Sequence, residues 1–163
     1  MNPWTDAVRE GLVAGTAASV LSAAALAVAG SRENGAAAAP VNAISHWFWD
    51  RRALRQDGAT WRFTLTGYLV HHAASVFWAT LHARAWGMRP EAKRPAAAVA
   101  GAATAAGVAC FVDYRLTPRR LTPGFEHRLS SPALLAVYTC FAIGLAIGSM
   151  AAGPPRQRNT SDR

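Results

Sequence analysis

The sequence predicts an all-α membrane protein with four transmembrane helices, up-down-up-down, and a short interfacial helix between the first and second. Hydrophobic residues make up 52% of the 163 residues, and charged residues only 16%, against about 25% in an average soluble protein. The charges are also clustered, and long uncharged runs separate the clusters. Because crossing about 30 Å of hydrocarbon takes about 20 apolar residues, these runs fit membrane spans.

The first predicted span is residues 12–29, which carry no charge. A secretory signal peptide is the alternative, because residues 27–29 (Ala-Val-Ala) resemble a cleavage site. The acidic residues Asp6 and Glu10 before the run favour an uncleaved helix instead. Small residues at three- and four-residue spacing let a neighbouring helix approach closely. For the first and third spans, the predicted helix-packing residues are Gly11, Gly15, Ser19, Ser22, Gly101 and Gly107.

The long connection after the first span predicts an interfacial helix over residues 41–52. Tryptophans at 47 and 49 lie beside arginines at 51 and 52. An amphipathic ring next to a cation suits the headgroup boundary, so this segment is expected to lie on or dip into the interface.

The other predicted spans are residues 63–81, 96–112 and 132–150. The second contains His71, His72 and Ser75, which a purely lipid-facing helix would not need. The third is rich in alanine and glycine and is expected to pack in the middle of the bundle. Ser131-Pro132 supplies a start signal for the fourth.

Residues 1–153 are predicted to form a single domain, and the polar tail 154–163 is expected to be disordered. An even number of spans places both termini on one side of the membrane, together with the basic turn at 84–95. Positive residues in short loops favour the cytoplasm, so both termini are expected there.

The up-down-up-down topology places the two long connections on the same face, and the second span starts from that face. We therefore expect a polar pocket there, and we expect His46, Asp113 and one of His71 and His72 to lie within direct or water-bridged contact. The residues assigned to this pocket are Asn42, His46, His71, His72, Ser75, Asp113, Tyr114, Glu126 and His127.

The net charge of +8 and the pI of about 11 indicate an anionic partner. Since the arginines flank apolar runs, the expected partner is the lipid bilayer and not nucleic acid. A homo-oligomer or a larger membrane complex is also compatible with the small-residue stripe of the first span.

The polar residues of the pocket suggest three chemistries. A metal could be held by His46, one of His71 and His72, Asp113, Glu126 and His127, although no HExxH or HxxxH spacing is present. A haem with two axial histidines is disfavoured because the first, third and fourth spans contain no histidine. The third possible chemistry is a proton-responsive site, in which a histidine titrates near neutral pH.

The favoured interpretation is a non-enzymatic membrane protein without a cofactor, with a His/Asp pocket near one membrane face and an accessory, pH-linked or stress-linked role. One alternative is a metal-assisted membrane enzyme that acts on a lipid-soluble substrate. Another is a small subunit of a larger membrane complex.

Three segments carry a resemblance to known proteins: residues 42–47 (NAISHW), 67–78 (GYLVHHAASVFW) and 113–126 (DYRLTP through LTPGFE). Here the chain resembles a group of small bacterial inner-membrane proteins with four helices, and it is more distantly similar to the YagU-like proteins. The resemblance covers residues 10 to 150. It implies a bacterial inner membrane and a stress-related role such as acid resistance, and it supplies no catalytic residues.

Overall fold

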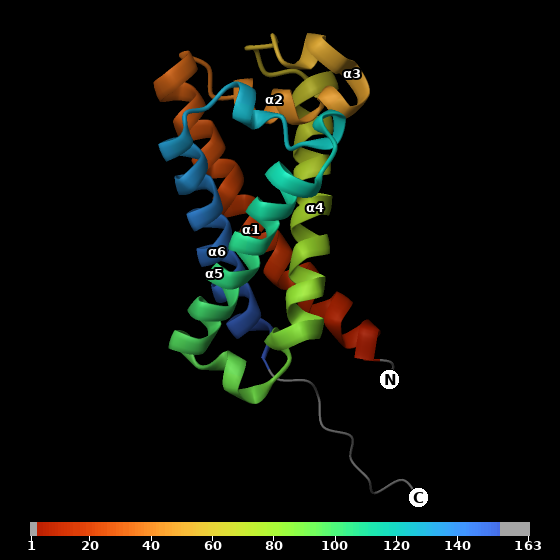
Figure 1. The fold of residues 1–163 in the computed structure, drawn as a ribbon, viewed down its shortest axis with the longest axis vertical. Helices are drawn as coiled ribbons and strands as arrows, with labels where there is room; N and C mark the ends of the chain where they lie inside the picture. The colour runs from red at the N-terminus through yellow and green to blue at the C-terminus, as the bar shows by residue number, and fades with distance from the viewer. Residues whose placement is uncertain (1–2, 154–163) are drawn as a thin grey trace, which may run out of the picture.

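The computed structural model describes residues 3–153, and within that range the chain is helical and contains no strand (Figure 1). The prediction of an all-α protein is confirmed. The tail at 154–163, for which disorder is predicted, lies outside the described residues.

Four long helices lie side by side in the described range, and each predicted span falls on one of them. They are α1 (Pro3–Asn34), α4 (Thr66–His82), α5 (Pro95–Phe111) and α6 (Ser131–Ala152). By length and composition, α1, α5 with its continuation to Leu116, and α6 could each cross a membrane. The 17-residue α4, which carries three histidines, is not among them. Three apolar helices of this kind are consistent with a membrane protein.

π-helical turns extend two of the long helices. The turns η1 (Trp61–Leu65) and η2 (Ala83–Gly87) flank α4, and η4 (Val112–Leu116) continues α5. Thr60 starts the first of these turns by accepting a hydrogen bond from the backbone N–H of Phe63. Turns of this kind are rare and are found disproportionately at functional sites.

Two short helices replace the single interfacial helix predicted over 41–52. They are α2 (Ala39–Ile44) and α3 (His46–Ala53), and they lie at the end of the molecule where α1 ends and α4 begins (Figure 1). Short 3-10 turns complete the connections: η3 (Pro90–Lys93) at the opposite end, and η5 (Arg119–Leu121) and η6 (Phe125–His127) between α5 and α6.

Helix α1 lies between α4 and α6, whereas α5 packs mainly on α6. The expectation that the Ala- and Gly-rich third span occupies the middle is therefore wrong. Glycines allow the close approach: a Cβ added at Gly15 would lie 2.5 Å from Val76 Cα, and one at Gly144 would lie 2.6 Å from Ala18 Cα. Contacts with backbone atoms this short cannot be relieved by rotating a side chain.

The remaining predicted packing residues have different surroundings. A Cβ at Gly11 would meet Thr80 of α4, and one at Gly101 would meet the Trp86 ring, whereas one at Gly107 would meet no atom within 4 Å. Ser19 and Ser22 are fully buried on α1.

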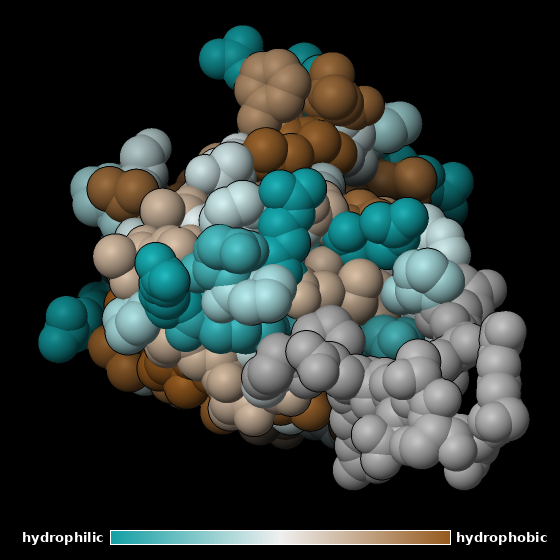
Figure 2. Space-filling model, turned by 90° about the horizontal axis from the view of Figure 1, so that it is seen from below, coloured by the Kyte–Doolittle hydropathy of each residue, from teal (hydrophilic) through white to brown (hydrophobic). Residues whose placement is uncertain are grey.

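The end of the molecule that carries η2 and η3 has the surface expected beside a membrane. Figure 2 shows hydrophilic side chains gathered over the middle of this end, with more hydrophobic ones around them. The sides of the long helices expose large apolar residues, among them Leu135, Phe77, Val99 and Ile147. Such continuous exposure of apolar side chains is the pattern of a lipid-facing surface.

Asp50 interrupts α3 with φ 47° and ψ −139°, a conformation that favours glycine. We expect Asp50→Gly to stabilise the protein by about 1 kcal/mol, because it removes the backbone strain at this exposed position. Thermal unfolding of the purified protein in mild detergent would show this as a higher midpoint. An Asp50→Ala variant, which keeps the Cβ, should not share the gain.

Candidate ligand pocket beneath the long connections

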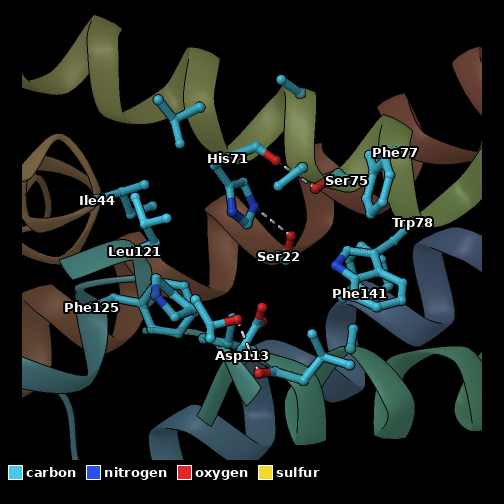
Figure 3. A pocket seen from close by; sticks show the side chains of 18 of the residues that line it. Ser22, Ile44, His71, Ser75, Phe77, Trp78, Asp113, Leu121, Phe125 and Phe141 are labelled. Carbon is cyan, nitrogen blue, oxygen red and sulfur yellow. Dashed lines mark hydrogen bonds between the residues drawn. The ribbon is translucent and has the colours of Figure 1, made fainter. Parts of the chain in front are cut away.

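A pocket of about 520 Å³ lies between α1, α4, α6 and the end of α5, beneath α2, α3 and the 117–125 segment (Figure 3). Its volume is within the range of small-molecule sites. Most of its lining is apolar, and a third of it is aromatic: Trp47, Phe48, Phe77, Trp78, Phe125, Tyr138 and Phe141.

His71 projects into this pocket from α4 and is held by α1. Its Nε2 lies 2.8 Å from Ser22 Oγ, and Ser75 Oγ donates to the His71 backbone oxygen at 2.8 Å. Ser22 gives its hydroxyl proton to the Ala18 backbone oxygen at 2.7 Å. Because that proton is already used, Nε2 of His71 is the donor in its contact with Ser22 Oγ.

Asp113 lies across the pocket from His71 (Figure 3). It belongs to the π turn η4, and its Oδ2 accepts a hydrogen bond from the Tyr138 hydroxyl at 2.6 Å. Within the described part of the chain, Asp113 is in no ion pair with arginine or lysine. The pocket therefore has an imidazole on one wall and a carboxylate on the other, separated by apolar and aromatic side chains.

Asn42 and His46, both assigned to the pocket from sequence, are buried beside it but do not line it. The amide of Asn42 donates to the backbone oxygens of Gln56 and Gly58 and accepts from Thr64 Oγ1. It therefore fixes the connection between α3 and α4.

His46 places Nδ1 2.9 Å from the Ala43 backbone oxygen, while its Nε2 is buried without a partner among the described residues. Gly124, with φ 94°, passes over it, and an added Cβ there would lie 2.6 Å from His46 Nδ1. This histidine is enclosed between α2 and the 117–125 segment.

The other predicted residues divide between the pocket and its surroundings. Ser75 lines the pocket, whereas His72 stacks on the Tyr68 ring, with centroids 5.9 Å apart. Tyr114 lines a separate groove between α5 and α6. Glu126 and His127 lie in η6, with 3.8 Å between Glu126 Oε1 and His127 Nε2. Of the nine residues, the structure brings His71, Ser75 and Asp113 to one cavity.

The histidines and carboxylates considered as metal ligands are separated. Across residues 3–153, no three His, Cys, Asp or Glu side chains come together in a group that could hold a metal ion. His46 is enclosed beside Gly124, and His127 is exposed.

Most of the lining residues were not assigned to the pocket from sequence, and two of them bond its polar groups directly. Tyr138 lies in an otherwise apolar span and is the partner of Asp113, while Ser22 was assigned to helix packing alone. A hydroxyl among apolar residues of a membrane span is a usable signal, because it needs a partner within the protein.

A second polar cluster, also not predicted, ties the opposite ends of α1 and α6 together. Lys93 Nζ lies 2.8 Å from Glu10 Oε2 and donates to the Ser149 backbone oxygen at 2.8 Å. Ser149 Oγ in turn donates to Glu10 Oε1 at 2.6 Å. The side chains of Lys93 and Glu10 are only 12% and 6% exposed. These contacts satisfy both charges, so the cluster is a structural clamp.

The chain matches no protein-family model, no curated protein and no solved structure. The chemistry of the pocket must therefore be argued from its own residues.

Proposed function

We propose that this chain is a four-span protein of a bacterial inner membrane, and that it binds a lipid-soluble ligand in the pocket between His71 and Asp113. Its role would be non-enzymatic: an accessory protein whose ligand occupancy responds to pH or membrane stress. One observation carries the proposal: a largely apolar cavity has a few polar groups on facing walls. Such cavities are typical of sites that bind and orient small apolar molecules.

The course of α4 supports a fourth span. With its two π-helical ends, the segment is helical from Trp61 to Gly87, a length of roughly 40 Å at 1.5 Å per residue. Of its three histidines, His71 contacts Ser22 of α1, His72 stacks on the Tyr68 ring, and His82 is buried. Polar residues in membrane spans are tolerated when they face such partners.

Two features support the proposed orientation and setting. The short connection between α4 and α5 holds Arg84, Arg89, Lys93 and Arg94, which favours the cytoplasmic side for that end and for both termini. At the other end, Arg62 lies over the Trp49 ring at 4.1 Å, an arrangement suited to the headgroup boundary.

The pocket has an entrance on the side of the molecule. Phe77 of α4 lines it and is 56% exposed, and Ala73 and Ala74, which also line it, are exposed. Helices α4 and α5 make few contacts with each other, and Trp78 lines both this pocket and a shallower one farther along the same pair. An apolar molecule dissolved in the bilayer could therefore enter between α4 and α5.

Filling the pocket tests the proposal. Ala74→Trp should lower labelling of the pocket walls by a neutral aryl-diazirine roughly tenfold, which corresponds to about 1.4 kcal/mol of binding. The labelled positions would be mapped by mass spectrometry on protein in nanodiscs, with labelling of exposed Leu135 as the reference.

Leu69→Trp is the matched control. Leu69 lies on the same helix, is exposed, and lines none of the pockets described here. This variant should leave labelling of the pocket unchanged. Equal labelling of the pocket walls in both variants, or labelling confined to the outer helix surfaces in the unmodified chain, would refute a ligand-binding role.

A further inference from the structure

We infer that the ligand is a lipophilic cation, whose charge lies beside Asp113 and whose apolar body packs among the aromatic rings of the pocket. This inference rests on the proposed ligand-binding function and names the class of ligand. It follows from the charge of the pocket, the shape of its lining and the position of the basic residues.

Among residues 3–153, no positively charged side chain pairs with the Asp113 carboxylate. Its hydrogen bond comes from Tyr138, a neutral donor, and within residues 3–153 no arginine or lysine forms an ion pair with it. The chain has 17 basic residues, and Arg115 is only two positions away. A carboxylate in a mainly apolar cavity is costly unless a cation compensates its charge or a proton neutralises it. A bound cation would supply that compensation.

Glu126 is a second carboxyl group near Asp113, outside the lining of the pocket. It lies near enough to Asp113 and Tyr114 to affect both electrostatically. Its Oε2 is buried without a hydrogen-bond partner in the described residues. His71, on the facing wall, has its Nε2 engaged by Ser22 Oγ at 2.8 Å. The charged groups around the cavity therefore favour a positive ligand.

The aromatic lining suits the same class of ligand. Phe77 and Trp78 lie on one side of the pocket, with Phe141 beside them, and Phe125 lies on another side (Figure 3). Aromatic faces attract cations, most strongly where water is excluded, and they also pack well against apolar groups. A cation with aromatic or alkyl substituents would use both properties.

An anionic ligand fits less well. Arg119 and Arg120, the basic residues closest in sequence to the lining residues Thr117 and Leu121, are exposed and do not line the pocket. They are placed to meet lipid headgroups instead. An anion would have to approach Asp113 with no cation from the protein beside it.

Two ions of nearly equal size and opposite charge test the inference directly. Tetraphenylphosphonium and tetraphenylborate would be bound to the unmodified protein in nanodiscs of zwitterionic lipid, with empty nanodiscs as the blank. We expect saturable binding of tetraphenylphosphonium, and binding of tetraphenylborate that is at least tenfold weaker. Because no variant is needed, this comparison does not depend on the stability of a mutant.

Asp113→Asn should weaken tetraphenylphosphonium binding roughly tenfold or more, while Asp50→Asn serves as the charge-matched control. Asp50 is an exposed carboxylate at the same end of the molecule, so its loss should leave the affinity unchanged.

Acidification from about pH 8 to about pH 5 should also weaken the binding of tetraphenylphosphonium. Protonation of Asp113 removes the negative charge that faces the cation. The other titratable groups around this carboxylate are His71 on the facing wall, Cys110, Tyr114, Glu126 and Tyr138.

The outcomes of these experiments distinguish the ligand-binding function from the inference that the ligand is a cation. Equal affinity for both ions, or an unchanged affinity in Asp113→Asn, would overturn the cation inference but leave a ligand pocket in place, as the neutral diazirine would show. Binding of neither ion, together with an unlabelled pocket, would overturn both.

Discussion

Replacing Gly15 with leucine is expected to separate α1 from α4 and to destabilise the protein by roughly 3 kcal/mol. A Cβ at this position would lie 2.5 Å from Val76 Cα and 2.9 Å from Val76 N. Both are backbone atoms, so the whole of α4 must move to admit the side chain. Because His71 on α4 is held by Ser22 on α1, the same movement would open the pocket. Thermal unfolding in mild detergent measures the first effect, and diazirine labelling of the pocket measures the second.

Gly107→Leu is the control for this substitution. Gly107 is also a glycine inside a helix, yet an added Cβ there would have no atom within 4 Å. Leucine should stabilise the protein by roughly 0.8 kcal/mol at that position, because glycine is a poor helix former. A Gly15→Leu protein as stable as Gly107→Leu would contradict the close packing of α1 on α4.

The sequence was sufficient to predict a helical membrane protein, but it did not indicate which helix lies in the middle. The third span is the richest in alanine and glycine, yet α1 lies between α4 and α6. Small residues allow close approach on whichever side they face, and composition does not show that side. On α6, Gly144 and Gly148 meet the backbone of α1, whereas Gly107 on α5 faces open space.

The residues that line the pocket could be predicted only in part, because the sequence does not show the direction in which each side chain points. Topology places His71 and Asp113 toward the same face of the membrane, and the structure puts both in one cavity. His72 follows His71 by one residue and therefore points elsewhere, to the Tyr68 ring. His46 also lies near that face, but the left-handed turn at Gly124 encloses it. Which histidine reaches the cavity depends on side-chain direction, and the polar pattern alone does not specify it.

The clamp of Glu10, Lys93 and Ser149 was not predicted from the sequence. Lys93 belongs to the basic turn at 84–95, from which cytoplasmic termini were predicted, and Glu10 was interpreted only as evidence for an uncleaved first span. In the structure Glu10 is buried and Lys93 is mostly covered, and Gly87 lies close enough that its added Cβ would be 2.5 Å from Glu10 Oε1. A charge near the end of a membrane helix can face lipid headgroups or a neighbouring helix, and sequence spacing does not distinguish the two.

Lys93→Met should therefore destabilise the protein by about 3 kcal/mol or more, since it leaves the Glu10 carboxylate buried without its cation. Ser149 Oγ would remain as a partner within the clamp, and one neutral hydrogen bond does not offset the loss of solvation. The measurement is the unfolding midpoint in detergent, compared with Arg94→Met. Arg94 is the neighbouring basic residue and is exposed, so its replacement should change the midpoint little.

The double variant Lys93→Met with Glu10→Gln distinguishes the loss of a buried pair from a simple loss of packing. Removing both charges leaves no uncompensated ion, so the double variant should be more stable than Lys93→Met alone. The amide oxygen that Glu10→Gln introduces can still accept the hydrogen bond from Ser149 Oγ. If the second substitution only added to the destabilisation, the Glu10–Lys93 pair would not be the interaction that holds α1 and α6 to the turn between α4 and α5.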